Sequence, residues 1–101
     1  MLTHLPDRDT ATGLARVLIA GRFAACVNVG APVESMYHWR GKIETATEFP
    51  VMCKTTASRY AAVEAAIRAH HPYELPDIVA IPIIDGYAPY LEWIAAGCAP
   101  T

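Results

Sequence analysis

The feature that most constrains the fold is the stretch from Cys26 to Thr55, where apolar and polar residues alternate over two runs joined by a compact turn. Alternation with a period of two is typical of a β-strand with one buried face. The first run, Cys26 to Arg40, breaks at Gly30–Pro32, and the second, Ile43 to Thr55, contains Pro50. Because the short turn "RGK" joins the runs, they predict a long antiparallel hairpin. Pro50 lacks an N–H group and predicts a bulge or an edge in the return strand.

The hairpin also carries an expected pairing. If "RGK" closes it and the ladder is unbroken, Cys53 lies opposite Gly30, and Cys26 then shares a sheet face with Cys53. A bulge at Pro32 or at Pro50 would reverse that parity. A joint site for the two thiols is therefore an open alternative.

Further elements flank the hairpin. Met1 to Leu5 reads as a short strand, and apolar residues then recur at helical spacing from Ala11 to Leu18. Asp7 or Asp9 suits the N-cap of this helix, and Gly21 suits its end.

Beyond the hairpin, a second helix is expected to begin near a cap at Thr56 or Ser58 and to end before Pro72. The run Ile78–Ile84 is almost continuously apolar, which predicts a strand buried on both faces. Pro89 then begins a short last helix.

The predicted order is β-α-β-β-α-β followed by a short helix, which is the α+β ferredoxin-like arrangement, in one domain over residues 1–101. Its two main helices cover one face of the sheet. The composition is 53% hydrophobic and 18% charged, more apolar material than one small core uses. The uncovered face therefore predicts a symmetric homo-oligomer.

Charge and patterning exclude several classes of partner. The formal net charge is −2 and the eight basic residues are scattered, so neither nucleic acid nor a membrane is an expected partner. The longest apolar run is far too short to span a bilayer, and no secretory signal is apparent. Three widely separated cysteines fit reduced thiols in a cytoplasmic protein. No phosphate-cradling glycine loop appears, so no organic cofactor is expected.

Several uncommon strings resemble those of the CutA family, the divalent-cation tolerance proteins. They are "LTHLPD", "RFAACVNVGAPVESMYHWRGKIE", "VMCKTT", "HPYELPDIVAIPIIDG" and "YLEWI", in order over nearly the whole chain. The resemblance implies a ferredoxin-like protomer, a compact homotrimer, and a link to copper and other divalent metal ions in metal homeostasis. It implies no established catalytic reaction, so an enzyme is not expected.

Three side chains are candidate metal ligands. Cys26 offers a soft thiolate, His71 an imidazole and Glu74 a carboxylate. Each has a simpler interpretation. Cys26 fits a small buried apolar residue, His71 fits the end of the helix before it, with its ring bonded to the last carbonyls, and Glu74 fits an exposed carboxylate. A metal at His71 would need ligands from elsewhere, such as Cys26 or a neighbouring subunit.

Aromatic residues suggest a second kind of site. Tyr37 and Trp39 alternate on one strand face, which is typical of a platform against a neighbouring subunit. The alternative is a cleft between subunits, lined by Tyr37, Trp39, Lys54 and Tyr73, in which Lys54 offers a charge to an anionic ligand. Tyr73 also fits a residue that only shapes its loop.

The cleft supports an alternative function. Trimeric ferredoxin-like proteins of the PII type are signalling proteins that hold a small molecule between subunits, and this step rests on fold analogy. A third function, an acylphosphatase-like hydrolase, is disfavoured. It needs an arginine in a glycine-containing phosphate loop after the first strand, and here that loop reads "HLPDRDT".

Overall fold

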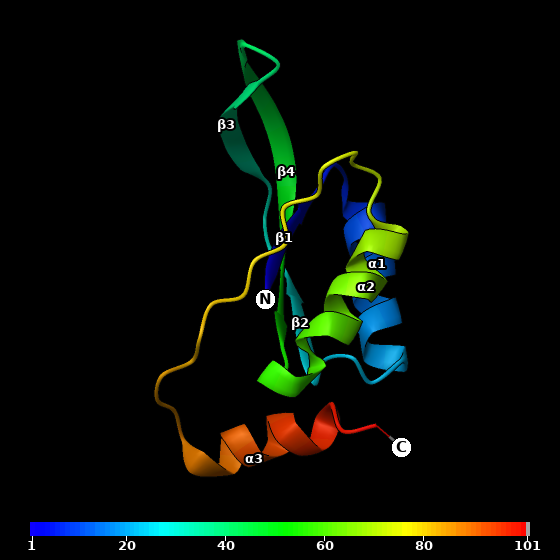
Figure 1. Ribbon diagram of the computed structural model, residues 1–101, viewed down its shortest axis with the longest axis vertical. Helices are drawn as coiled ribbons and strands as arrows, with labels where there is room; N and C mark the ends of the chain where they lie inside the picture. Colours follow the sequence, from blue (N-terminus) through cyan, green and yellow to red (C-terminus); the bar gives the residue numbers. More distant parts are fainter. Residues whose placement is uncertain (101) are drawn as a thin grey trace.

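The computed structural model describes residues 1–100 as a four-stranded antiparallel sheet with two of its three helices packed on one face (Figure 1). The elements in chain order are β1 (Leu2–Leu5), α1 (Arg8–Ala20), β2 (Cys26–Val29), β3 (Val33–Trp39), β4 (Lys42–Lys54), a 3-10 turn η1 (Ala57–Arg59), α2 (Tyr60–His70) and α3 (Ala88–Gly97). β4 is central, with β1 on one side and β2 on the other. β3 pairs with the N-terminal half of β4. The mixed α/β architecture is confirmed.

The first helix has the predicted ends. The Asp7 carboxylate accepts a hydrogen bond from the Thr10 N–H at 2.7 Å, and the Gly21 N–H donates to the Val17 carbonyl at 3.0 Å. The Thr10 N–H bond lowers the pKa of Asp7. The caps predicted for the second helix are not formed. Thr56 precedes η1 without a side-chain cap bond, and its hydroxyl instead contacts that of Ser58 at 3.1 Å.

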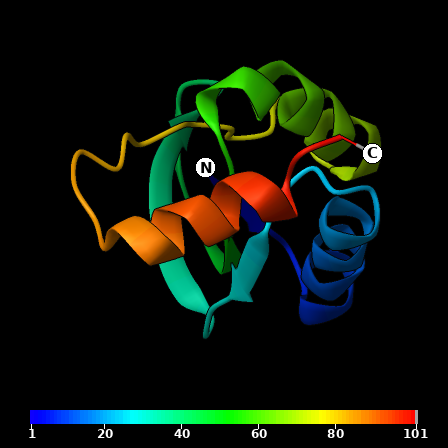
Figure 2. The same ribbon diagram turned by 90° about the horizontal axis from the view of Figure 1, so that it is seen from below.

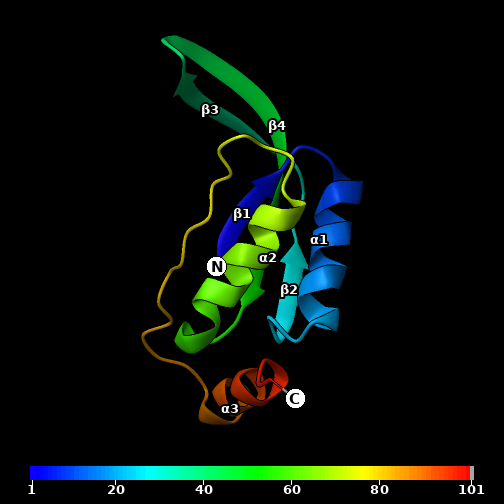
Figure 3. The ribbon, with the colours of Figure 1, turned by 45° about the vertical axis from the view of Figure 1, so that its right-hand side comes forward.

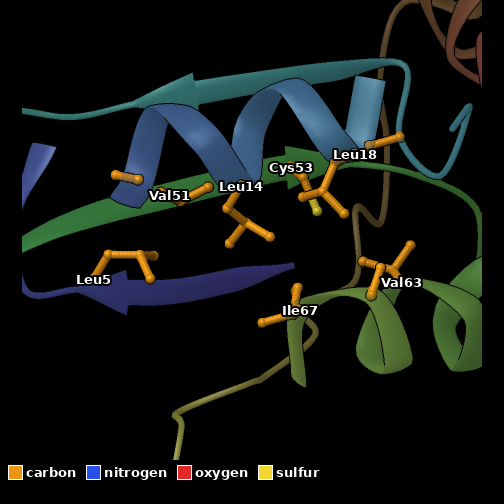
Figure 4. Close-up of a cluster of buried hydrophobic side chains, with 10 residues drawn as sticks. Leu5, Leu14, Leu18, Val51, Cys53, Val63 and Ile67 are labelled. Carbon is orange, nitrogen blue, oxygen red and sulfur yellow. The ribbon is translucent and has the colours of Figure 1, made fainter. Parts of the chain in front are cut away.

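The core lies between α1, α2 and the sheet, and both helices stand on the same side of the strands (Figures 1 and 3). Figure 4 shows side chains from these layers converging, with Leu14 and Leu18 of α1 facing Val51 and Cys53 of β4. The largest fully buried apolar side chains are Leu5, Leu14, Leu18, Ile67, Val51 and Val63. The helical spacing of α1 and α2 therefore directs one stripe of each helix into the sheet.

The long hairpin forms as predicted, from β3 and β4. It turns at Arg40 and Gly41, whose φ angles are 51° and 79°. Two consecutive positive φ angles are typical of the type I′ turn that closes a two-residue hairpin, and the glycine adopts this conformation without strain. The hairpin extends past the ends of α1 and α2 (Figures 1 and 3).

Cys26 and Cys53 do not share a sheet face, which is the alternative expected if a bulge interrupts the ladder. Cys26 lies opposite Lys54 and Val27 lies opposite Cys53, so the two thiols point to opposite faces. Val29 pairs with Val51, and Val33 pairs with Glu48. Four residue steps between β2 and β3 therefore lie opposite only three on β4. The ladder slips by one residue at this point, which reverses the parity.

Pro50 lies at this irregularity. The Gly30 N–H donates to the Pro50 carbonyl at 2.8 Å, and proline has no N–H to donate in return. The bulge considered near Pro32 is therefore confirmed, since the extra residue lies between β2 and β3, whereas the bulge predicted at Pro50 in the return strand is not formed. A Cβ at Gly30 would lie 2.7 Å from Pro50 Cγ, so glycine also permits the close approach of the two strands.

The buried strand predicted for Ile78–Ile84 is wrong for the protomer. Only Val79 forms a bridge, to Leu2, with backbone hydrogen bonds of 2.9 and 3.2 Å. Beyond it the chain runs past the end of β1 and bends away from the body, so no strand of the protomer lies beside it (Figures 1 and 2). Ile81 and Ile84 are 68% and 93% exposed.

The last helix, α3, crosses beneath the sheet (Figure 2). The Arg22 guanidinium donates to the carbonyls of Ala96 at 2.7 Å and Ala99 at 2.9 Å. A Cβ at Gly97 would lie 2.8 Å from the Ala25 Cβ, so this glycine permits close packing. Helix α3 is thus held mainly at its C-terminal end.

Candidate functional site

A wide cavity lies between the β3–β4 hairpin and the segment that follows α2. Its volume is about 850 Å³, and we call it the hairpin cavity. It is lined by His4, Ser35, Met36, Tyr37, His38, Trp39, Ala46, Glu48, Pro72, Tyr73, Glu74, Leu75 and Asp77. Three of the four residues predicted for a cleft, namely Tyr37, Trp39 and Tyr73, are therefore brought together.

A buried carboxylate lies within this cavity. Glu48 of β4 is only 9% exposed, and its Oε2 accepts a hydrogen bond from the Tyr73 hydroxyl at 2.8 Å. Burial and the nearby Glu48 carboxylate raise the pKa of Tyr73, so its hydroxyl keeps the hydrogen that it donates. The pair connects the hairpin to the segment after α2.

His71 occupies a structural position. It is the residue after α2, and it is 9% exposed. Its Nε2 donates to the His4 carbonyl at 2.7 Å, because a carbonyl only accepts, and its Nδ1 accepts from the Tyr73 N–H at 3.2 Å. Both ring nitrogens are thus engaged. The predicted bond to the last helix carbonyls is made by the neighbouring His70, whose Nδ1 contacts the Ala66 carbonyl at 2.9 Å.

Two hydrogen-bonded side-chain pairs lie at the edges of the hairpin cavity. His4 Nδ1 and the Asp77 carboxylate are 2.6 Å apart. The backbone N–H of His4 also donates a hydrogen bond to the Asp77 carboxylate at 3.1 Å. Arg40 in the hairpin turn donates to Glu74 at 2.9 Å, with both side chains largely exposed. The predicted ligand Glu74 is therefore already paired with a cation, and the exposed pair is weak.

Cys26 and Lys54 lie at the other end of the sheet. They are cross-strand neighbours on the face away from α1 and α2, and Cys26 is partly exposed. The Lys54 ammonium donates to the Tyr90 hydroxyl at 3.1 Å, and this bond raises the pKa of Lys54. Lys54 lines a second cavity of about 540 Å³, beside Ile81, Ile83 and Leu91. Sequence reasoning placed Lys54 with the hairpin aromatics, whereas the structure places it near α3.

The three predicted metal ligands do not converge within one chain. Among residues 1–100, no group of three or more His, Cys, Asp and Glu side chains is arranged to hold a metal ion. Each of the three has a different partner, since Cys26 contacts Asn28, His71 contacts His4 and Glu74 contacts Arg40. The residues of a single protomer therefore do not fit a metal site.

Sequence reasoning missed Glu48, His4 and Asp77. The alternation of the hairpin contained a signal for the first, since even-numbered residues of the return strand share the face of Tyr37 and Trp39. The His4–Asp77 contact joins residues 73 positions apart, and no local pattern indicates it.

In the part of the chain that the structure describes, no helix has the length and apolar character to cross a membrane.

Comparison with known proteins gives one consistent relationship. The sequence pattern of the family described as CutA1 divalent ion tolerance protein matches residues 1–97. A curated relative from Danio rerio, Protein CutA homolog, is 39% identical over 95 residues, which is 94% of this chain and 63% of the relative. The chain thus spans less than two thirds of that relative's length.

Solved structures agree with the sequence match. The divalent cation tolerance protein from Thermus thermophilus superposes with a TM-score of 0.94 at 34% identity, covering 97% of this chain and 95% of that one. A protein from Nostoc sp. described as PII-like protein CutA gives a TM-score of 0.91 at 29% identity, covering 99% and 96% of the two chains. From the sequence match over 97 residues and these folds, we conclude that the chain belongs to the CutA1 divalent ion tolerance protein family.

Proposed function

We propose that the protein works in divalent-cation tolerance as a homotrimer that binds copper or another divalent metal ion, in the cytoplasm and without catalysing a reaction. The observation that carries this proposal is membership of a family described by divalent ion tolerance. The open face of the sheet supports assembly, since Met52 at its centre is 48% exposed and the apolar residues after Val79 are largely uncovered.

Metal binding in this proposal involves more than one subunit. No three ligand side chains gather within residues 1–100, so a closed site needs donors from a second copy. Cys26 is the best placed ligand, because its thiol is partly exposed on the open face. Glu74 and His71 are further ligands, and each must give up a present partner: Arg40 for Glu74 and the Tyr73 N–H for His71 Nδ1.

An anaerobic titration with Cu(I), and with Cu(II) in parallel, tests the proposal. We expect Cys26→Ser to weaken binding by roughly tenfold or more, and His71→Ala and Glu74→Gln to weaken it less, since each removes one ligand. Cys98→Ser is the control, because this thiol is buried and contacts the Ile94 carbonyl at 3.1 Å. Affinity that is unchanged in all three ligand variants would remove these residues as the site.

A second function is supported by the hairpin cavity. A cavity of about 850 Å³ is within the range that small-molecule sites occupy, and it combines aromatic walls with a few polar groups. The Nostoc relative is itself described as PII-like. This alternative is a trimeric signalling protein that binds a small organic molecule in the cleft at the subunit boundary.

Thermal unfolding distinguishes the two functions. A ligand that binds only the folded protein raises its unfolding midpoint, and the rise grows with the logarithm of ligand concentration above Kd. Stabilisation by divalent metal ions and not by organic compounds supports the first function. Stabilisation by an organic compound while metals have no effect supports the second.

A further inference from the structure

The second cavity, of about 540 Å³, lies between the C-terminal end of β4, the segment after Val79 and helix α3, and we call it the α3 cavity. Its walls are mainly aliphatic, since residues 81–83 supply one side and Leu91 and Ile94 of α3 supply another. Ile94 is 4% exposed, whereas Ile81 is 68% exposed. The cavity therefore has a buried apolar side and an open side, and its size is within the range of small-molecule sites.

The only charged side chain among the residues 1–100 that line this cavity is that of Lys54. The polar side chains beside it are uncharged hydroxyls, from Thr55, Thr56 and Tyr60. No carboxylate among the described residues lies within ion-pair distance of Lys54. The α3 cavity thus has one positive charge without a counter-charge, whereas three carboxylates line the hairpin cavity.

Lys54 retains hydrogens for a ligand. Its ammonium group donates to the Tyr90 hydroxyl at 3.1 Å and lies 5.3 Å from the centre of the same ring. An ammonium group has three hydrogens, and this bond uses one of them. The Tyr90 hydroxyl accepts the bond and keeps its own hydrogen to donate. An ammonium and a phenol at the rim of the cavity therefore present donors to one carboxylate.

We propose that the α3 cavity binds a carboxylate with an alkyl chain, its charge on Lys54 and Tyr90 and its chain against Ile81, Leu91 and Ile94. This site is separate from both candidate functions, because it involves neither a metal ion nor the hairpin cavity. It gives a place to the anionic ligand that the sequence suggested for Lys54, away from Tyr37 and Trp39.

Other ligand classes fit less well. Lys54 would repel a metal ion or an organic cation, and neither a carboxylate nor an imidazole of residues 1–100 lines the cavity. A phosphate monoester carries about two negative charges, and one ammonium would leave part of that charge unpaired among aliphatic walls. An alkyl carboxylate has a single charge and an apolar body, which match the two properties of this cavity.

Isothermal titration calorimetry of the intact assembly, freed of metal ions by dialysis against a chelator, tests the proposal. The probes are octanoate, the shorter hexanoate and the uncharged 1-octanol. We expect octanoate to bind once per chain and 1-octanol to bind more weakly by roughly tenfold or more, because it lacks the charge. Hexanoate should bind about tenfold more weakly than octanoate, since it buries two fewer methylene groups.

Substitutions of Lys54 complete the test. Lys54→Met removes the charge and keeps an unbranched side chain, and we expect octanoate affinity to fall by roughly tenfold or more. Lys54→Arg keeps the charge and should retain most of the affinity. Lys42→Met is the matched control, because Lys42 is exposed at the other end of β4. Tyr90→Phe removes one donor and should weaken binding by a smaller factor.

Circular dichroism and sedimentation velocity verify that each variant folds and assembles. If Lys54→Met does not fold, the comparisons of octanoate with 1-octanol and of the parent with Tyr90→Phe decide the question.

Four results would overturn the inference: no octanoate binding to the parent protein, equal binding of octanoate and 1-octanol, equal binding of octanoate and hexanoate, or full octanoate affinity in Lys54→Met. No octanoate binding together with dissociation of the Lys54→Met assembly would show that a carboxylate of a neighbouring copy pairs with Lys54 instead. These failures leave the two candidate functions standing, because the tests of those functions use other probes.

Discussion

At the scale of single residues, the contact between Tyr73 and Glu48 has the largest consequences. It is a hydrogen bond from a hydroxyl to a mostly buried carboxylate, and it joins two segments 25 positions apart. Removing the donor leaves a buried acceptor without a partner, which costs more than an ordinary hydrogen bond contributes.

Tyr73→Phe is therefore expected to lower the free energy of unfolding by about 1–3 kcal/mol at pH 7. Tyr87→Phe is the control, because Tyr87 is 76% exposed. Urea unfolding of the two variants and the parent protein measures the difference. Equal stabilities would show that the Tyr73 hydroxyl adds nothing to the fold.

The same residue predicts a dependence on alkaline pH. The pKa of Tyr73 is raised above its ordinary value of 10.0, first by burial and then by Glu48. The folded protein thus keeps the hydroxyl hydrogen where the unfolded chain loses it. The stabilisation is complete below pH 10 and is lost as the pH rises above it. Between pH 7 and about pH 11, the parent should lose more stability than Tyr73→Phe. An equal loss in both would contradict the assignment.

At the scale of elements, the weakest attachment is that of α3. Arg22 has a φ of 56°, which is unusual for a residue with a side chain, and from this position its guanidinium reaches two carbonyls at the end of α3. A planar guanidinium suits two acceptors at once, and a basic group is favourable at a helix C-terminus. Helix α3 should thus open locally without unfolding of the core.

Arg22→Ala is expected to increase amide hydrogen exchange in the last turn of α3 by about tenfold or more, since each lost bond is worth about 1 kcal/mol. Exchange in α1 and β4 should change little. Arg16→Ala, at an exposed arginine of α1, is the matched control. Unchanged exchange in α3 would mean that other contacts hold this helix.

At the scale of the whole molecule, the protomer is elongated, with principal extents of 45 × 26 × 23 Å. The hairpin projects at one end, and the apolar segment after Val79 lies uncovered near the other (Figure 1). Backbone groups that lack a partner and exposed isoleucines favour pairing with another chain. The proposed homotrimer would pair these backbone groups and bury these isoleucines.

Ile84→Glu is accordingly expected to shift the assembly toward protomers, because a carboxylate resists burial in an interface. Ile19→Glu, at an isoleucine of α1 that is 45% exposed, should leave the assembly intact. Sedimentation velocity over a dilution series measures both. A parent protein that stays a folded protomer at all concentrations would reject the trimer itself.

The sequence by itself determined the local elements and the family. The spacing from Ala11 to Leu18, the alternation around "RGK" and the cap at Asp7 each act within a few residues, so a linear pattern suffices to predict them. Pro50 also indicated an irregular ladder, because a missing N–H group is a property of one residue, but it did not indicate that the extra residue lies on the partner strand.

Tertiary structure alone decided the pairing of distant groups. The slip of one residue at Gly30–Pro32 placed Cys26 and Cys53 on opposite faces, and Lys54 came to lie beside Tyr90 and away from Tyr37. Apolarity indicated that Ile78–Ile84 would be buried, but burial as a strand requires a neighbour, and β1 reaches only Val79. Contacts between residues far apart in the chain depend on register and on where strands end, and composition and periodicity contain neither.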